Sequence, residues 1–294
     1  MTEQRLPETT AASLFEGLQA IDAKRWGEAA IALRHAVSLD GSQASAHYYL
    51  GTALAALGDP QGAADAFRSA LAIEPTMAPA HNNLGLALRD MGRLEEAVRA
   101  FEQALVRDPN DVLAHNNLGV TLWELGLHED ALEAYRNALE IKRNYATVYN
   151  NLGAALRDQG RLAEAIAMFR QARRLDHGNA YIPKNQGLAL LAVGQRPTAR
   201  RALRRALHLI EAQLQETSVA LGPRLVKASV LLGLGRGLEA LQIVRETLAS
   251  RPLAYGAIRS CLSDCELLEG APEADECAIL LRAAVARLRE HRGG

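Results

Sequence analysis

The stretch AHNNLGLALRDMGRLEEAVRAFEQAL, from Ala80 to Leu105, returns 34 residues later as AHNNLGVTLWELGLHEDALEAYRNAL, from Ala114 to Leu139. A third version, VYNNLGAALRDQGRLAEAIAMFRQAR, follows after another 34 residues. Repetition at a fixed period of this length is typical of chains that stack one supersecondary unit many times. The sequence therefore raises two questions: which repeated residues fold the unit, and which recur for a function.

Small and large residues recur at the same places in six copies of the unit. The eighth place is always glycine: Gly17, Gly51, Gly85, Gly119, Gly153 and Gly187. Ala recurs 12 and 19 places after each of these glycines, with a large apolar residue between the two alanines. A second glycine midway through most units, such as Gly92, supplies the positive φ that lets a chain leave a helix. We therefore expect each unit to fold as helix, tight turn, helix and short loop.

The composition predicts an all-α protein without a membrane segment. The chain has 294 residues, of which 49% are hydrophobic and only 4% aromatic. Its apolar residues are mostly Ala and Leu, which favour helices, whereas the residues that favour strands are sparse. No apolar run reaches the roughly 18 residues needed to span a bilayer, and the first ten residues lack the features of a signal peptide. We predict a cytoplasmic protein, and the formal net charge of -1 identifies no partner.

The repeat pattern resembles the tetratricopeptide repeat family. This resemblance implies an α-solenoid, a right-handed superhelix of antiparallel helix pairs in which the first helices line a concave groove. We expect six consecutive units at residues 10–43, 44–77, 78–111, 112–145, 146–179 and 180–213. Beyond them we expect an insert that extends a helix (214–220), a seventh unit (221–254), degenerate capping helices (255–290), and flexible ends at 1–9 and 291–294.

Paired asparagines are the part of the repeat that folding explains least, because Asn is a mediocre helix residue. The fifth and sixth places of four successive units hold Asn82–Asn83, Asn116–Asn117, Asn150–Asn151 and Lys184–Asn185. One explanation is structural, with each amide bonding the neighbouring unit. The other is functional: an amide offers both donors and an acceptor to a peptide backbone, and helices about 10 Å apart would present one Asn per three or so residues of an extended chain.

The asparagine series is similar to the ladder in the repeat domain of the O-linked N-acetylglucosamine transferase family. That similarity implies binding of peptide backbones in the groove, largely irrespective of sequence. Some tetratricopeptide repeats instead hold a C-terminal carboxylate with Lys at the fifth place and Asn at the ninth. Only Lys184 fits that second pattern, so we do not expect this function here.

Other residues are expected on the same face as the asparagines. Seven places after the first Asn of each pair stand Arg89, Trp123 and Arg157, and the N-terminal units carry Tyr48 and Tyr49. We expect Trp123 to be the main anchor for a ligand, because Trp and Arg dominate binding energy at interfaces. The alternative is that Trp123 packs against the next unit.

Three histidines share the fourth place of successive units: His47, His81 and His115. Helices about 10 Å apart cannot bring three ring nitrogens within about 2 Å of one zinc ion. We interpret these histidines as packing groups with a polar tip. The three cysteines (Cys261, Cys265 and Cys277) also lack a His partner at metal-binding spacing, so we expect no metal.

A basic stretch covers residues 161–205, with ten Lys or Arg against two acidic residues. Its most basic part is RPTARRALRRAL, which holds Arg200, Arg201, Arg204 and Arg205. The simplest interpretation is a solvated outer helix face, and the alternative is a docking patch for an acidic partner. Aromatic residues are not interleaved with these arginines, so nucleic acid is not an expected partner.

The sequence contains no catalytic motif and no region outside the repeats that is large enough for a catalytic domain. The phosphate-loop-like GLGRG at 233–237 falls on a predicted turn and follows no strand. We therefore predict no enzyme and no cofactor. The predicted function is binding of an extended peptide or partner protein in the groove. The alternatives are a self-assembling scaffold, hence a homo-oligomer, and an accessory subunit that docks on an enzyme through the basic 161–205 surface.

Overall fold

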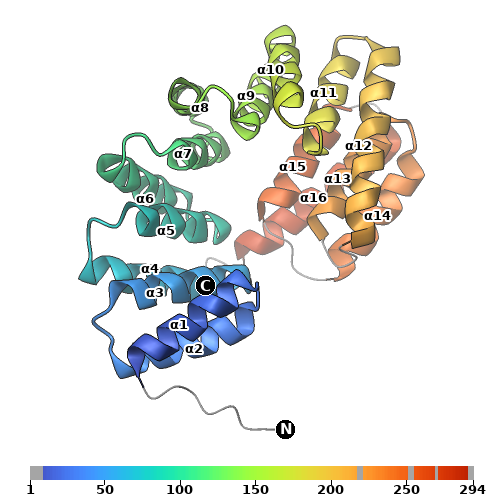
Figure 1. The fold of residues 1–294 in the computed structure, drawn as a ribbon. Coiled ribbons are helices and arrows are strands. Elements are labelled where there is room, and N and C mark those ends of the chain that lie inside the picture. Colours follow the sequence, from blue (N-terminus) through green and yellow to red (C-terminus); the bar gives the residue numbers. More distant parts are fainter. Residues whose placement is uncertain (1–8, 217–220, 251–254, 269–270, 291–294) are drawn as a thin grey trace. The chain divides into compact units, whose positions relative to one another are not determined.

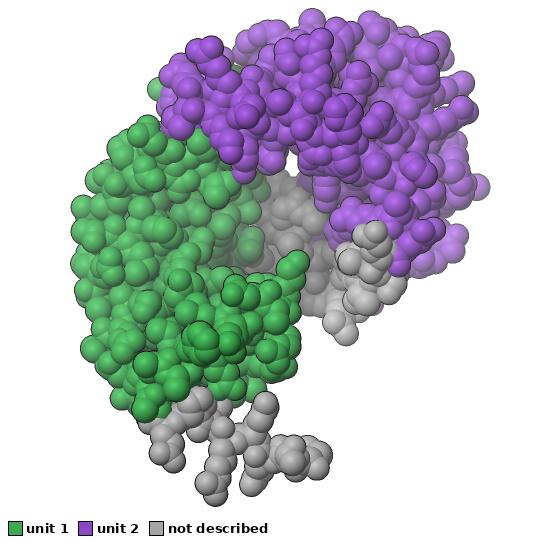
Figure 2. All heavy atoms as spheres, viewed as in Figure 1, with its two compact units in different colours: residues 1–134 green, residues 135–294 purple. Residues whose placement is uncertain are grey.

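The computed structural model describes residues 9–216, 221–250, 255–268 and 271–290. The chain divides into two compact units, residues 1–134 (green in Figure 2) and residues 135–294 (purple). Most of the predicted flexible N-terminus (1–8), the last four residues of the predicted insert (217–220), the end of the predicted seventh unit (251–254) and the tail (291–294) lie outside the described residues.

Within the described residues the fold is all-α, as predicted, and the helices follow one another as antiparallel pairs (Figure 1). Unit 1 contains α1 (Thr10–Asp22), α2 (Trp26–Leu39), α3 (Ala44–Ala56), α4 (Pro60–Ile73), α5 (Ala78–Asp90), α6 (Leu94–Arg107) and α7 (Val112–Glu124). Helix α8 (His128–Ile141) contains the division between the units. None of the helices in the described ranges has an apolar stretch long enough to cross a bilayer.

Unit 2 continues with α9 (Ala146–Asp158), α10 (Leu162–Leu175), α11 (Tyr181–Ala192), α12 (Arg196–Glu216), α13 (Leu221–Gly233), α14 (Gly237–Ser250), α15 (Tyr255–Glu266) and α16 (Pro272–Glu290). Helix α12 has 21 residues, whereas α10, the preceding second helix of a pair, has 14. Because an α-helix has 3.6 residues per turn, α12 is about two turns longer.

Two kinds of packing build each unit. The helices of a pair pack against each other, as α3 does with α4 and α9 with α10. In addition, the first helices of successive pairs contact one another, which produces a row of α1, α3, α5 and α7 in unit 1. We call the surface of this row the first-helix face. Its helices α3, α5 and α7 carry the unit 1 residues that the sequence assigned to a binding groove, whereas Asn150, Asn151, Arg157 and Asn185 lie on α9 and α11 of unit 2.

Glycine is needed at the eighth place because a large side chain lies directly against the helix backbone there. A Cβ atom added to Gly85 would lie 2.6 Å from a ring carbon of Phe101, and one added to Gly153 would lie 2.7 Å from the ring of Phe169. Both rings are fully buried, and the two alanines that flank each ring in sequence, such as Ala97 and Ala104, are 0% exposed. The glycine and the two alanines let the helices approach closely enough for the ring to fill the space between them.

The midway glycines also have the predicted backbone conformation. Gly58, Gly92, Gly126, Gly160 and Gly194 all have φ between 75° and 83°. In the first unit the same place holds Lys24, which has a φ of 56°. The turn therefore imposes a left-handed conformation even where the sequence supplies no glycine.

Candidate functional site

The asparagine pairs form hydrogen bonds between successive repeats. Asn117 Nδ2 donates to Asn82 Oδ1 at 3.1 Å, and Asn185 Nδ2 donates to Asn150 Oδ1 at 3.0 Å. In each case a sixth-place amide bonds the fifth-place amide of the preceding unit, 35 residues earlier. The structural explanation for these asparagines therefore has direct support: each bond fixes the position of one first helix against the next.

Tyr48 takes part in the same arrangement at the N-terminal side. Asn83 Nδ2 donates to the Tyr48 hydroxyl at 3.2 Å, so a tyrosine at the fifth place replaces the asparagine acceptor. Burial raises the pKa of Tyr48, and the hydrogen bond from Asn83 opposes that rise. The Tyr48 ring also lies 5.2 Å from the ring of Tyr49 and 5.9 Å from that of Phe67, centroid to centroid. Tyr48 is therefore part of the packing between helices as well as of the surface.

The two asparagines of a pair differ in exposure. Four ladder residues are at most 8% exposed: Asn82, Asn116, Asn150 and Asn185. Asn83, Asn117 and Asn151 are partly exposed. An asparagine amide has two N–H donors and one acceptor oxygen, and the bond to Asn82 engages one N–H of Asn117. The second N–H and the oxygen of Asn117 are therefore the groups with which it could bind a peptide backbone.

The fourth-place histidines bond the loops before their own helices. The Nε2 atoms of His47, His81 and His115 lie 3.0 Å from the carbonyl oxygens of Gly41, Pro75 and Pro109. Because a carbonyl only accepts, Nε2 must donate, and the imidazole holds the inter-unit loop. The described residues contain no cluster of three or more His, Cys, Asp or Glu that could hold a metal ion.

Trp123 and Arg89 lie on the first-helix face, and both are partly exposed. The Trp123 ring lies against the His128 ring at the start of α8, with centroids 4.2 Å apart and planes tilted by 45°. His128 lies in the same expected repeat (112–145) as Trp123, so this contact is not the packing against the next unit that the sequence left open. It fixes the orientation of the indole while leaving part of its surface accessible.

Arg157 differs from its predicted position in an open groove. The side chain is 4% exposed and forms ion pairs with Asp158 at 2.8 Å and with Asp264 at 3.2 Å. Burial alone would lower the pKa of Arg157, but the neighbouring carboxylates of Asp264 and Asp158 raise it above its ordinary value. The reason for the difference is that α15 contributes Asp264 to this face of α9, so Arg157 is not available to a partner in this structure.

Asp264 is the residue that the sequence interpretation missed, and Lys184 was named there without being assigned to a site. Lys184 Nζ donates to Asp264 Oδ2 at 2.6 Å, and both side chains are 1% exposed. The sequence carries one indication of this ion pair: Lys184 is a cation at the repeat position where the three preceding units carry Asn. Its partner is 80 residues away, in the region where the repeat register is lost, so no spacing rule could identify Asp264.

The predicted basic patch lies on the exposed face of α12. Arg200, Arg201, Arg204 and Arg205 are all exposed, and none pairs with an acidic side chain among the described residues. Arg205 donates to the carbonyl oxygen of His177 at 3.3 Å. The patch belongs to a basic half of the chain: residues 135–294 carry 24 Lys or Arg against 15 Asp or Glu, whereas residues 1–134 carry 9 against 19.

The remaining candidates have structural roles. Cys261, Cys265 and Cys277 are buried free thiols in the core formed by α13 to α16. Hydrogen bonding with Cys261 and Cys277 raises the pKa of the Cys265 thiol. Gly235, in the GLGRG segment, lies in the turn between α13 and α14 with a φ of 79°. This glycine therefore serves the same purpose as the midway glycines of the other units.

Comparison with solved structures shows the same fold. A crystal structure of the MamA protein is 24% identical with a TM-score of 0.53, and the match covers 58% of this chain and 93% of that one. PilF of Pseudomonas aeruginosa is 23% identical with a TM-score of 0.58, covering 72% and 93%. A chain of the APC/C hetero-tetramer Cut9-Hcn1 is 20% identical with a TM-score of 0.62, covering 74% and 44%. At these identities the likeness concerns the fold alone.

Comparison of the sequence with protein families identifies the repeat itself. Models described as tetratricopeptide repeat match residues 44–77, 82–146, 146–175 and 185–205. No curated protein matches the sequence. The matched segments contain the asparagine pairs, the close-packed Gly85 and Gly153, and the turn glycines from Gly58 to Gly194. The chain therefore belongs to the tetratricopeptide repeat family, whose members act as protein–protein interaction modules.

Proposed function

We propose that the first-helix face of unit 1 binds an extended segment of a partner protein. The observation that carries this proposal is the pair of partly exposed amides of Asn83 and Asn117. Each is held by a hydrogen bond from its Nδ2 atom to the preceding unit. Groups fixed before binding lose little conformational freedom when a ligand arrives, so they bind it more tightly.

Spacing and neighbours support the same proposal. Helices about 10 Å apart match three residues of an extended chain at about 3.3 Å each, so successive amides would meet backbone groups at regular intervals. Trp123, fixed against His128, would add selectivity for an apolar side chain. The buried ladder residues Asn82 and Asn116 would support the face without touching the ligand.

The test is selection of ligands from random displayed peptides of about 12 residues, a length that spans three to four first helices. Affinities of the selected peptides are then compared for wild type and Asn83→Ala/Asn117→Ala. We expect a loss of at least about tenfold, because two backbone-directed hydrogen bonds disappear. Gln103→Ala, an exposed amide on the second helix α6, is the matched control and should bind as wild type does. Equal binding by the folded double variant would exclude the asparagine series as the ligand site.

Self-assembly is the second candidate, and the charge distribution favours it. Residues 1–134 have a formal charge of −10 and residues 135–294 one of +9. An acidic first half of one copy could therefore attract the exposed arginines on α12 of a second copy in a head-to-tail contact. An acidic protein of another kind, such as an enzyme that this chain serves as an accessory subunit, is the competing occupant of the same patch.

Light scattering over a concentration series at low and high salt separates these possibilities. Self-assembly predicts a mass that rises with concentration and falls as salt screens the charges. Arg200→Gln/Arg201→Gln/Arg204→Gln/Arg205→Gln should abolish the rise, whereas Arg136→Gln/Arg143→Gln should not. A constant monomer mass at all concentrations excludes self-assembly and leaves the acidic partner. The proposal retains the predicted cytoplasmic location, which fractionation of cells expressing the chain would test.

A further inference from the structure

One carboxylate joins the C-terminal helices of unit 2 to the row formed by α9 and α11. Asp264 lies on α15 and is 1% exposed. Its Oδ2 accepts from Lys184 Nζ on α11 at 2.6 Å, and its Oδ1 accepts from Arg157 Nη1 on α9 at 3.2 Å. We call Arg157, Asp158, Lys184 and Asp264 the Asp264 site. Two cations from neighbouring first helices thus hold a single carboxylate that arrives from the end of the chain.

The apolar packing of α15 lies elsewhere. Ile258, Cys261 and Cys265 belong to a core built with residues of α13, α14 and α16. In the described residues, α15 packs along α13 and α16, and its bonds to α9 and α11 are polar. They comprise the two ion pairs of Asp264 and a 3.5 Å hydrogen bond from Ser263 Oγ to Asp158 Oδ2. Leu268, just after α15, packs both against this core and against the cluster of α11, α12 and α13 residues, so apolar contact on this side lies beyond the end of α15.

Stability alone does not account for such a site. Moving charges out of water is expensive, so a buried ion pair is often no better than apolar side chains of the same shape. The formal charges balance only while Asp264 is present, because Arg157 and Lys184 then face Asp158 and Asp264. Without Asp264, two cations would face one carboxylate.

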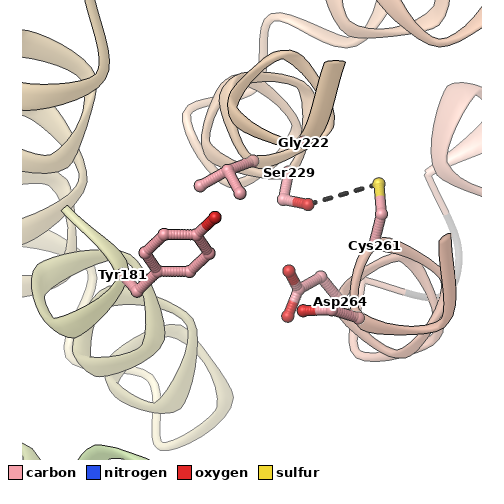
Figure 3. Close-up of a pocket in the computed structure, with 7 residues that line it drawn as sticks. Tyr181, Gly222, Ser229, Cys261 and Asp264 are labelled. Carbon is pink, nitrogen blue, oxygen red and sulfur yellow. Dashed lines mark hydrogen bonds between the residues drawn. The ribbon is translucent and has the colours of Figure 1, made fainter. Parts of the chain in front are cut away.

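A small pocket borders the Asp264 carboxylate. Figure 3 shows Tyr181, Ser229, Cys261 and Asp264 around the pocket, with side chains from α11, α13 and α15. Tyr181 is 38% exposed, so one wall of the pocket reaches the surface of the unit. Burial raises the pKa of Tyr181. Its hydroxyl can donate a hydrogen bond, as any neutral tyrosine can. The pocket has a volume of about 30 Å³, room for roughly one water molecule beside Asp264, and Arg157 and Lys184 are not among its lining residues.

We propose that Arg157 and Lys184 form a carboxylate-binding site that Asp264 occupies as a ligand from within the chain, and that an acidic side chain of a partner can replace it. Replacement would separate α15 from α9 and α11 and expose both cations. The intramolecular carboxylate competes at a high effective concentration, so a free peptide should bind well only when Asp264 is removed. This proposal concerns unit 2 and does not depend on ligand binding to the asparagines of unit 1.

Chemical labelling of lysines can test the proposal on the full chain. Lys184 is buried, whereas Lys24 and Lys142 are exposed and provide internal references. After brief acetylation and mass spectrometry, we expect Lys184 to be protected in the wild type. In Asp264→Asn, labelling of Lys184 should rise at least about tenfold relative to the references, because a buried cation without its partner favours the open state. Glu266→Gln removes a charge from an exposed place on the same helix and should leave Lys184 protected.

Ligand replacement is tested on Asp264→Asn with two peptides capped at both ends and a third that is capped only at its N-terminus. The peptide Gly-Gly-Asp-Gly-Gly should restore protection of Lys184, and Gly-Gly-Asn-Gly-Gly should not. The Asn peptide with a free C-terminal carboxylate distinguishes a chain end from a side chain. Protection of Lys184 in the folded variant before any peptide is added would overturn the proposal, since α15 would then be held by other contacts. If no acidic peptide reduces the labelling of Lys184, then Arg157 and Lys184 do not form a carboxylate-binding site.

A second variant covers the case in which Asp264→Asn does not fold. Lys184→Met/Asp264→Asn leaves Arg157 paired with Asp158 and contains no unpaired buried charge. The double variant should fold. Its equilibrium constant for unfolding should be at least about tenfold smaller than that of Asp264→Asn. If the double variant is as unstable as the single one, Asp264 does not act through Lys184 and the proposal fails.

Discussion

Asn117 shows how one side chain can serve the fold while part of its amide remains exposed. Its amide bonds Asn82, which is 7% exposed, so removing the donor leaves a buried acceptor without a partner. We expect Asn117→Ala to lower the free energy of unfolding by about 1–2 kcal/mol in urea titrations. Asn82→Ala/Asn117→Ala removes both groups and should lose less than the sum of the two single changes. Additive losses would show that the two amides do not interact.

Two glycines can be compared in the same way, because replacement by alanine should lower the stability of the protein at one position and raise it at the other. Gly85→Ala places a Cβ atom 2.6 Å from the Phe101 ring and should destabilise the protein by about 1–3 kcal/mol through overpacking. Gly27→Ala has no atom within 4 Å of the new Cβ and lies in the exposed first turn of α2. It should stabilise by about 0.4–1 kcal/mol, because the unfolded chain loses freedom. Thermal unfolding of both variants measures the difference, and equal signs would contradict this account of the eighth place.

At the scale of the helix, an arginine and a glutamate three residues apart recur at the start of second helices. Arg93 pairs with Glu96, Arg161 with Glu164 and Arg236 with Glu239. In each case the hydrogen bond from the arginine lowers the pKa of the glutamate. A carboxyl whose pKa is lower in the folded state stabilises the fold above its ordinary pKa, and this contribution is lost as the pH falls through the lowered value.

The helix α6 allows this pH dependence to be measured. Glu96→Gln should be less stable than wild type at pH 7 by no more than about 0.5 kcal/mol, since exposed pairs are screened by solvent. The difference should shrink toward zero as the pH is lowered below the ordinary glutamate value of about 4.3. Glu102→Gln, on the exposed side of the same helix, is the control. A difference for Glu96→Gln that stays constant with pH would rule out the ion pair as its source.

Helix pairing could be predicted from the sequence because the residues that allow two helices to pack closely recur with the same period. Gly85 and Phe101, or Gly153 and Phe169, stand 16 residues apart in every copy, so the close approach of two helices leaves a visible pattern. The bond from Asn117 to Asn82 also follows the period, and the sequence left it as one of two explanations. Asp264 could not be found, since a single carboxylate 107 residues from Arg157 belongs to no repeat. Burial of Arg157 follows from Asp264 and was missed for the same reason.

Over the whole molecule, contacts are made mainly between helices that are neighbours along the chain, so disruption should remain local. Phe169→Ala and Phe67→Ala remove equivalent buried rings from unit 2 and unit 1. Each should lower local stability by about 3–5 kcal/mol. Hydrogen exchange should then show reduced protection in α9 to α11 for Phe169→Ala and in α3 to α5 for Phe67→Ala. Each variant is the control for the other, and equal loss of protection in both units would mean that the chain unfolds as one cooperative body.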